Sequence, residues 1–190
     1  MARSQGLVAQ DTLATVSLKD VNRIMDVGGG SGAFLTQVGS KYRNIAMTLF
    51  DLPQVVPAAE ERFAQQGMAQ RLSIVPGSFR HDALPKDADC ISLIRVCYDH
   101  SDATVRDLLS KVFDALPAGG RLLISEPMTG GTQPTRAGDV YFQLYTLAMR
   151  TGRTRSQAEL GRLLGNVGFR DIRLPKPRRA FITSVVTARR

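Results

Sequence analysis

The sequence predicts an α/β fold in which a doubly wound, mostly parallel sheet carries one antiparallel strand at its C-terminal end. Three observations support this prediction. Short apolar runs alternate along the chain with segments whose apolar residues recur at helical spacing. A glycine-rich turn over 28–32 follows the first apolar run and precedes a helical segment. The last two apolar runs are separated only by residues 175–179, a link short enough for an antiparallel pair.

The first half of the chain is expected to form a helix, a strand and the glycine turn in succession. Apolar residues at helical spacing predict a helix over 3–16 that leads into a buried strand at 22–27. After the turn, Phe34, Leu35 and Val38 mark the apolar side of a helix. Strands are then expected at 45–50 and 71–75, with a helix over 53–66 between them.

The second half continues the alternation and ends in the antiparallel pair. The near-continuous apolar run at 89–96 is typical of a strand buried in a parallel sheet. Ser101 and Ser156 are expected to cap helices over 101–116 and 156–167. The remaining elements are a strand at 121–125, a helix over 136–150, and strands at 169–174 and 181–188.

The glycine turn predicts a ligand site, because glycines let a ligand approach the main chain closely and the following helix start offers unpaired N–H groups. Gly28, Gly30 and Ala33 satisfy the dinucleotide fingerprint, whose third position tolerates alanine. The same turn satisfies the acidic-x-Gly-x-Gly-x-Gly pattern of S-adenosylmethionine (SAM) methyltransferases. Asp51, at the end of the second strand, would grip ribose hydroxyls in either case. An NAD-dependent oxidoreductase therefore stays open as the alternative.

Two features favour SAM over a dinucleotide. Asp26 precedes the first glycine by two residues, where a carboxylate would repel a pyrophosphate but can hold an ammonium group. Residues 117–121, Pro-Ala-Gly-Gly-Arg, turn tightly into a strand, as methyltransferases commonly have. We therefore expect SAM as the cofactor.

Composition and charge limit the class of protein. The chain has 190 residues, of which 43% are hydrophobic, enough for one globular domain with a full core. No apolar run approaches the ~20 residues that cross a bilayer, and no secretory leader is recognisable, so we expect a cytoplasmic protein. The net charge of +8 is scattered and not interleaved with aromatic residues. This argues against a nucleic-acid partner and predicts at most a weak attraction to anionic membrane surfaces, peripheral to the inner membrane.

The cysteines and histidines give little indication of a metal site. Cys90 and Cys97 have apolar neighbours and are expected to be buried, unbonded thiols. His81 stands in a polar segment with no metal-ligand spacing around it, so we expect no metal.

The segment Leu93–Asp102, Leu-Ile-Arg-Val-Cys-Tyr-Asp-His-Ser-Asp, carries a family resemblance. With it the chain resembles, over residues 4–188, the catalytic domain of the plant-type small-molecule O-methyltransferases, which include bacterial antibiotic and carotenoid enzymes. The triplet Tyr98-Asp99-His100 is most similar to the carotenoid branch, whose acceptors include hydroxyneurosporene and demethylspheroidene. The resemblance implies a Rossmann-like class I methyltransferase sheet and SAM-dependent methylation of a hydroxyl on a small lipophilic acceptor, an acyclic hydroxycarotenoid. The pieces that carry it are residues 26–32, 51–53, 77–79, 95–102, 117–127 and 155–169.

The resemblance also implies roles for matched positions. Ser78 and Phe79 would flank the adenine of SAM, and Arg95 stands where many relatives have a lysine near the cofactor. Glu126 and Glu159 match carboxylates that flank and orient the catalytic base of the family. The other cofactor-binding positions are Asp26, Gly28, Gly30 and Gly32 at the turn, and Asp51 at the ribose with Leu52 beside it.

The catalytic base is the point at which this chain departs from the family. Relatives have His-Asp-Trp, whereas Tyr98 here holds the histidine position and His100 the tryptophan position. A tyrosine has an unperturbed pKa of about 10 and is protonated at neutral pH, while a histidine near ~6.5 is better matched to proton acceptance. We expect His100 to be the base, with Asp99 supplying nearby negative charge. Tyr98 stays as the alternative, in which it orients the acceptor hydroxyl as a hydrogen-bond donor.

The resemblance also bears on domain organisation. Relatives carry an N-terminal helical domain that dimerises and covers the substrate, whereas this chain begins one helix before the glycine turn. We expect a lead-in helix over 1–20, a SAM-binding catalytic domain over 21–190, and a homodimer only together with the N-terminal domain. The apolar faces of 3–16 and 136–150 should then be partly exposed. A non-enzyme alternative is a SAM-binding domain that is inactive without its lid domain.

Overall fold

The computed structural model describes residues 2–132, 134, 136–150 and 152–190. Its strands are β1 (Arg23–Val27), β2 (Ala46–Asp51), β3 (Leu72–Pro76), β4 (Cys90–Ile94), β5 (Arg121–Glu126), β6 (Arg170–Arg173) and β7 (Ser184–Arg189). Its α-helices are α1 (Ala2–Thr15), α2 (Ala33–Lys41), α3 (Pro57–Gln65), α4 (Asp102–Ala115), α5 (Phe142–Met149) and α6 (Gln157–Val167). Short 3₁₀ turns occupy Ala69–Arg71 and Cys97–Asp99, and a π-helical segment, Arg136–Tyr141, leads into α5.

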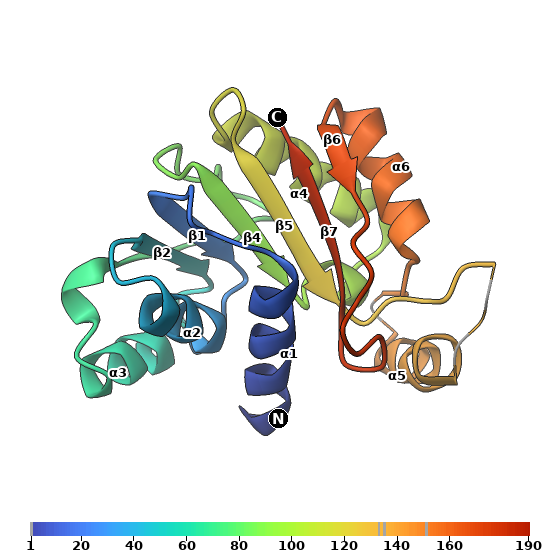
Figure 1. Cartoon of the computed structure of the whole chain (residues 1–190), viewed down its shortest axis with the longest axis horizontal. Coiled ribbons are helices and arrows are strands. Elements are labelled where there is room, and N and C mark those ends of the chain that lie inside the picture. Colours follow the sequence, from blue (N-terminus) through green and yellow to red (C-terminus); the bar gives the residue numbers. More distant parts are fainter. Residues whose placement is uncertain (1, 133, 135, 151) are drawn as a thin grey trace.

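The strands form one sheet in the order β3-β2-β1-β4-β5-β7-β6 (Figure 1). Strands β1 to β5 are parallel to one another, and β7 is antiparallel to both β5 and β6. This confirms the predicted mostly parallel sheet with an antiparallel C-terminal strand. Because β1 has β2 on one side and β4 on the other, the strand order reverses at β1, which is where open α/β sheets bind ligands.

Several element boundaries differ from the sequence prediction, and the cause is clearest at α3 and β7. Helix α3 begins at Pro57 rather than at Pro53, because the chain first makes a turn in which the Val55 N–H donates to the Leu52 carbonyl at 2.8 Å. Strand β7 begins only at Ser184, since the Ile182 N–H bonds back to the Arg179 carbonyl at 2.8 Å. In both cases a local turn competes with the regular element that the apolar pattern indicates.

The core lies in two layers because successive strand side chains point to opposite faces of the sheet. On one face, Ile24 and Met47 pack with apolar residues of α1, α2 and α3. On the other face, Met25 and Ile91 pack with the apolar stripes of α4 and α6. Burying both faces is what a parallel sheet requires, and it leaves the carboxyl ends of the strands as the place where side chains can meet a ligand.

The apolar face of helix 3–16 is exposed only at its margin, where Leu7 is 37% exposed. Val8, Ala9 and Leu13 are all buried, because α1 packs against α2 and the strands β5 and β7. The buried Asp11 carboxylate accepts two hydrogen bonds from the Arg179 guanidinium, at 2.8 and 2.7 Å, which ties α1 to the segment before β7.

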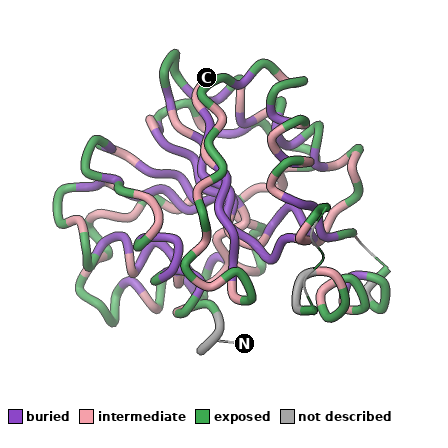
Figure 2. The backbone as a smooth tube through the Cα atoms, turned by 45° about the vertical axis from the view of Figure 1, so that its right-hand side comes forward, coloured by how far each residue is buried: buried purple, intermediate pink, exposed green. Residues whose placement is uncertain are grey.

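Helix α5 has the exposed apolar face that the sequence predicts. Leu144 is 60% exposed and Leu147 is 72% exposed, and Val140 in the preceding turn is also exposed. Figure 1 shows α5 standing beside the end of the sheet, and in Figure 2 most of it has the colour of exposed residues. Within the described residues, every helix is too short or too polar to cross a membrane.

Candidate functional site

The glycine turn lies at the carboxyl end of β1 and is held by the end of β2. Gly28 and Gly30 have φ angles of 71° and 58°, in the left-handed region that favours glycine. The Gly28 N–H donates to the Phe50 carbonyl at 2.8 Å. One Asp51 carboxylate oxygen accepts from the Gly30 N–H and the other from the Leu52 N–H, both at 2.7 Å. Asp51 is therefore fixed beside the turn, with free lone pairs on both oxygens.

Two adjoining pockets open around this turn. The first, here called the glycine-turn pocket, has a volume of about 290 Å³, and the second, the Ser78 pocket, about 320 Å³. Gly28, Arg95 and Asp99 line both, so the two pockets share a wall. The glycine-turn pocket is also lined by Asp26, Gly30, Tyr98 and Tyr145. The Ser78 pocket is also lined by Asp51, Leu52, Ser78, Phe79, Arg80 and His100.

Asp26 lines the glycine-turn pocket and has a buried, unpaired carboxylate oxygen beneath Gly29. Its side chain is buried, and its Oδ1 accepts a 2.6 Å hydrogen bond from the Ser92 hydroxyl. Its Oδ2 has no hydrogen-bond partner among the described residues. Burial raises the pKa of the Asp26 carboxyl to about 7 against the opposing effect of the Ser92 hydrogen bond, and the nearby Asp51 charge acts in the same direction as burial. A cationic ligand group at this place would hold the carboxylate ionised.

Arg95 and Tyr98 form the wall opposite the turn. Arg95 adopts a left-handed φ of 59°, and its N–H donates to the Ser125 carbonyl at 2.8 Å. Its Nη2 donates to the Tyr98 hydroxyl oxygen at 3.1 Å. Burial raises the pKa of Tyr98 to about 12, although the Arg95 charge opposes this. The Tyr98 hydroxyl therefore accepts from Arg95 and stays protonated. Burial raises the pKa of the Asp99 carboxyl, and both the charge of Arg95 and a hydrogen bond from the Tyr98 hydroxyl oppose this, so Asp99 is an acceptor for the Tyr98 proton.

Tyr98 is covered by aromatic side chains of α5. Its ring centre lies 6.3 Å from that of Phe142 and 6.2 Å from that of Tyr145. The sequence indicated neither contact. The only available signal was the presence of aromatic residues in the predicted helix over 136–150, and periodicity does not show which strand end such a helix covers.

His100 lies in the Ser78 pocket and not beside Tyr98. Its ring packs edge-to-face on Phe79, with ring centres 5.2 Å apart, and its Nδ1 lies 3.2 Å from Nη2 of Arg80. Burial lowers the pKa of His100, and the charges of Arg80 and Arg155 lower it further, so the ring is neutral near pH 7. The 3₁₀ turn at Cys97–Asp99 separates the two side chains, because each residue of such a turn rotates by about 120°. This placement counts against His100 as the base.

The two glutamates expected near the base have different positions. Glu126 is buried, and its Oε2 accepts from the Tyr98 N–H at 3.1 Å, so it supports the backbone of the triplet. Glu159 instead completes a capping box at the start of α6, where its Oε2 accepts from the Ser156 N–H at 2.7 Å. Its other oxygen pairs with Arg153 at 3.0 Å. The structure therefore brings Glu126, but not Glu159, to Tyr98.

Gly32, the third glycine expected to line the cofactor, packs between two helices. It lines neither of the two pockets. A Cβ atom at Gly32 would lie 2.7 Å from the ring of Phe63, so the glycine lets α2 pack closely on α3. The third glycine of the turn thus serves helix packing, whereas Gly28 and Gly30 face the ligand site.

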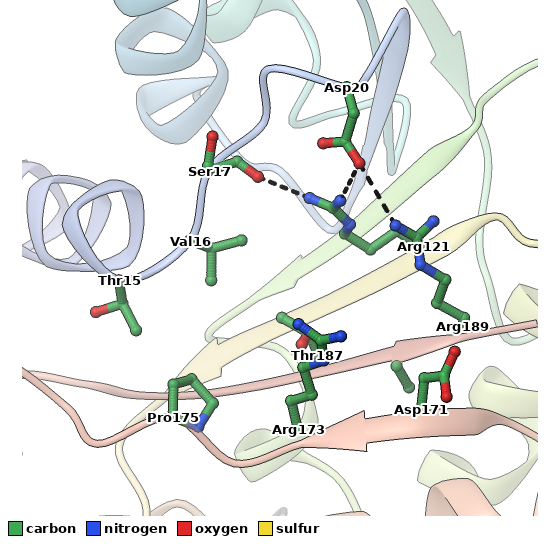
Figure 3. A pocket seen from close by; sticks show the side chains of 11 residues that line it. Thr15, Val16, Ser17, Asp20, Arg121, Asp171, Arg173, Pro175, Thr187 and Arg189 are labelled. Atoms are coloured by element: carbon green, nitrogen blue, oxygen red, sulfur yellow. Dashed lines mark hydrogen bonds and ion pairs between the residues drawn. The ribbon is translucent and has the colours of Figure 1, made fainter.

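A further cavity, of about 370 Å³, lies at the opposite end of β5, where Arg121 begins that strand (Figure 3). Arg121 and Arg189 share the Asp20 carboxylate, at 2.5 and 3.4 Å, and Arg121 also donates to the Ser17 carbonyl at 2.7 Å. These pairs join the segment before β1 to β5 and β7. The cavity therefore lies at a joint between elements and is separate from the glycine turn.

Comparison with known proteins places the fold and the glycine turn in a family. Residues 1–170 match the O-methyltransferase domain family. The chain belongs to this family. It is 52% identical over 188 residues to a demethylspheroidene O-methyltransferase of Cereibacter sphaeroides and 53% identical over 190 residues to one of Rhodobacter capsulatus. These alignments cover 99% and 100% of the chain but 50% and 47% of the relatives, so the chain spans about half their length.

Solved structures agree with this membership. The domain is similar to human N-acetylserotonin methyltransferase in complex with SAM, with a TM-score of 0.83 and 29% identity. It is also similar to TnmH, with a TM-score of 0.86 and 30% identity. The alignments cover 99% and 100% of this chain and 55% and 56% of those chains. The resemblance stated from the sequence is confirmed, including the branch that its Tyr98-Asp99-His100 triplet indicates.

The buried carboxyl of Glu126 makes the stability of the O-methyltransferase domain depend on pH. Burial raises its pKa from 4.5 to about 7, against the hydrogen bond from the Tyr98 backbone N–H and the charge of Arg155. Between these values the folded state holds a proton that the unfolded state has lost, so the free energy of unfolding falls as pH rises. Glu126→Gln should remove up to about 1.4 kcal/mol per pH unit of this slope. Urea unfolding of both proteins between pH 4.5 and pH 7 measures it, and parallel curves would contradict it.

Glu159 should affect helix stability without affecting His100. Glu159→Ala removes the capping box and is expected to lower the free energy of unfolding by about 1 kcal/mol. The His100 ring should keep its titration, because Glu159 bonds Ser156 and Arg153 instead. Proton NMR of the histidine rings can follow both the unfolding of the protein and the titration of His100, since the chain has only two histidines, His81 and His100. The control Glu60→Ala removes an acidic residue from the first turn of α3. A shift of the His100 pKa in Glu159→Ala alone would restore Glu159 as an orienting group.

Proposed function

We propose that the protein binds SAM across the two adjoining pockets and transfers its methyl group to a hydroxyl of a small lipophilic acceptor. The observation that carries this proposal is the pair of carboxylates on either side of Gly28. Asp51 lines the Ser78 pocket and Asp26 lines the glycine-turn pocket, while Gly28 lines both. A ligand with hydroxyl groups at one end and a cation at the other matches this arrangement.

The chemistry of SAM fits the residues that are present. Ribose hydroxyls can donate to Asp51, whose oxygens each accept one backbone N–H and retain a lone pair. The adenine would lie between Ser78, Phe79 and His100, and the ammonium group of the methionine part would meet the unpaired Oδ2 of Asp26. Gly28 has to be a glycine between these ends, because a Cβ there would lie 2.9 Å from the side chain of Val96.

The Asp51 carboxylate is expected to control SAM affinity. Asp51→Ala removes charge-assisted hydrogen bonds to the ribose, which should weaken SAM binding by about 1.5–3 kcal/mol, roughly tenfold or more. Calorimetry on the 190-residue chain measures the affinity. Glu60→Ala, on the exposed surface of α3, serves as the control. Unchanged SAM affinity in Asp51→Ala would remove this assignment, and tighter binding of NAD than of SAM would favour the oxidoreductase alternative.

We propose that the chain contributes to methyl transfer mainly by placing the acceptor oxygen. SAM supplies an already activated methyl group, so the acceptor oxygen has only to lie in line with it, and positioning provides most of the rate. Tyr98 stands in the pocket assigned to the methionine part, where its protonated hydroxyl can turn from Asp99 to donate to the acceptor oxygen. His100 stands at the adenine end, where a neutral imidazole can pack and hydrogen-bond. This arrangement favours Tyr98 as the orienting donor over His100 as the base.

Two substitutions separate these roles. Tyr98→Phe should lower kcat by about tenfold, since one neutral hydrogen bond contributes ~1 kcal/mol or somewhat more, and should leave the KM for SAM unchanged. His100→Ala should raise the KM for SAM and leave kcat near that of the wild type. Steady-state kinetics on the complete gene product measures both. A large loss of kcat in His100→Ala with normal turnover in Tyr98→Phe would establish His100 as the base.

We propose an acyclic hydroxycarotenoid as the acceptor, supported by the identity of more than half of the aligned residues to two demethylspheroidene O-methyltransferases. Such an acceptor is lipophilic, and the aromatic rings of Phe142 and Tyr145 on α5 stand next to Tyr98. The relatives are about twice as long as this chain, and we propose that a second domain covers the acceptor and forms a homodimer. Without such a second domain, the chain would bind SAM without transferring methyl groups.

We also propose a cytoplasmic protein that touches the inner membrane weakly, since its net charge is +8.

A further inference from the structure

We propose that Arg155 and Gly152, in the link between α5 and α6, are positioning residues that set where Tyr98, Asp99 and His100 lie. The inference rests on the proposed function in one respect, namely that this triplet forms the wall between SAM and the acceptor. Neither residue lines the glycine-turn pocket or the Ser78 pocket, so both would act through the triplet.

Arg155 binds the backbone just before the triplet and at its last residue. Its side chain is fully buried, with 0% exposure. Its Nη1 donates to the Cys97 carbonyl and its Nη2 to the His100 carbonyl, both at 2.8 Å. Its Nε donates to Asp102 at 2.8 Å, which balances the buried charge. The planar guanidinium thus spans the 3₁₀ turn in a way that the single ammonium of a lysine cannot.

The triplet needs such support because its own hydrogen bonds are few and long. Within the turn, the Asp99 N–H bonds the Val96 carbonyl at 3.3 Å and the His100 N–H bonds the Cys97 carbonyl at 3.1 Å. From the sheet side, the buried Glu126 carboxylate accepts the Tyr98 N–H. Buried ionisable groups from two distant segments therefore hold the N–H and C=O groups of one short turn.

Gly152 presses directly on the same backbone. A Cβ atom at this position would lie 2.3 Å from the Tyr98 carbonyl oxygen and 2.4 Å from the His100 nitrogen. These are backbone atoms, which cannot swing away as the end of a side chain can. Gly152 is not among the glycines with positive φ, so its lack of a side chain serves close packing on the triplet.

A displacement of the turn would move the walls of both pockets. Tyr98 faces the glycine-turn pocket, His100 faces the Ser78 pocket, and Asp99 lines both. A misplacement of about 1 Å at a reacting centre can cost 10²-fold in rate. The link between α5 and α6 therefore sets the geometry of a site that it does not itself contact.

The test uses two variants and two matched controls. Arg155→Lys keeps the positive charge but loses the planar guanidinium that spans the 3₁₀ turn. Gly152→Ala adds one methyl group against the triplet. Arg153→Lys changes the neighbouring arginine, which also pairs with Asp102 but does not bond the triplet. Gly6→Ala adds a methyl group in α1, where a Cβ meets nothing within 4 Å. Circular dichroism establishes that each protein is folded.

The first readout is the NMR titration of His100 in the 190-residue chain, with His81 as internal reference. In Arg155→Lys and Gly152→Ala, His100 should leave its half-buried place beside Arg80, and its pKa should rise towards the ordinary value of histidine. Both controls, and His81 in every protein, should titrate as in the wild type. A folded Arg155→Lys and a folded Gly152→Ala with wild-type His100 titration would overturn the proposal.

The second readout is kcat for methyl transfer by the complete gene product at saturating SAM. Arg155→Lys and Gly152→Ala should lower it by about 10²-fold, and the controls should not. Should Arg155→Lys fail to fold, Gly152→Ala decides, and wild-type kcat in that variant overturns the proposal. If no protein transfers methyl groups, wild type included, the proposed function fails. The His100 titration then still decides whether Arg155 and Gly152 position the triplet.

Discussion

The constraint on which the site depends is the place of β1 between β2 and β4. Parallel strands need both faces of the sheet covered, so a ligand is bound beyond the strand ends, and in open α/β sheets this is at the carboxyl ends. At β1 the connections leave in opposite directions, and the glycine turn, Asp51 and the triplet come from the ends of three adjacent strands. Glu126, at the end of β5, then supports the triplet from the next strand.

The buried charged groups around this edge differ in how fully their hydrogen-bonding atoms are paired. Asp26 and Glu126 are buried carboxyls, each with one oxygen that has no partner among the described residues. Burial raises the pKa of both to about 7, so each carboxyl is only partly ionised at neutral pH. Arg155 is the opposite case, a buried cation whose three nitrogens all find acceptors. The fully satisfied group stabilises the backbone, whereas the partly satisfied Asp26 faces a pocket and remains able to bind a cation.

Local patterns in the sequence predicted the strands, the glycine turn and the position of Asp51. The direction of side chains could not be predicted where the chain leaves regular structure. Residues 98 and 100 would share a face in a strand, but the 3₁₀ turn sends them into different pockets. Arg155 at a helix start looks like a surface residue, because its acceptors come from a segment more than fifty residues away. For Glu159 a local signal did exist, since Ser156-x-x-Glu159 has the spacing of a capping box.

Helix α5 joins an outer surface to the interior of the site. Phe142 and Tyr145 cover Tyr98 on its inner side, while Leu144 and Leu147 point to solvent on its outer side. Burying a leucine side chain fully contributes roughly 1.5–3 kcal/mol, so a surface that covers the outer side would also hold the inner side more firmly over Tyr98. Thermodynamic linkage makes this effect reciprocal. A surface that covers Leu144 and Leu147 would strengthen the binding of a compound under the aromatic rings by a certain factor. The bound compound would strengthen the association of that surface with α5 by the same factor.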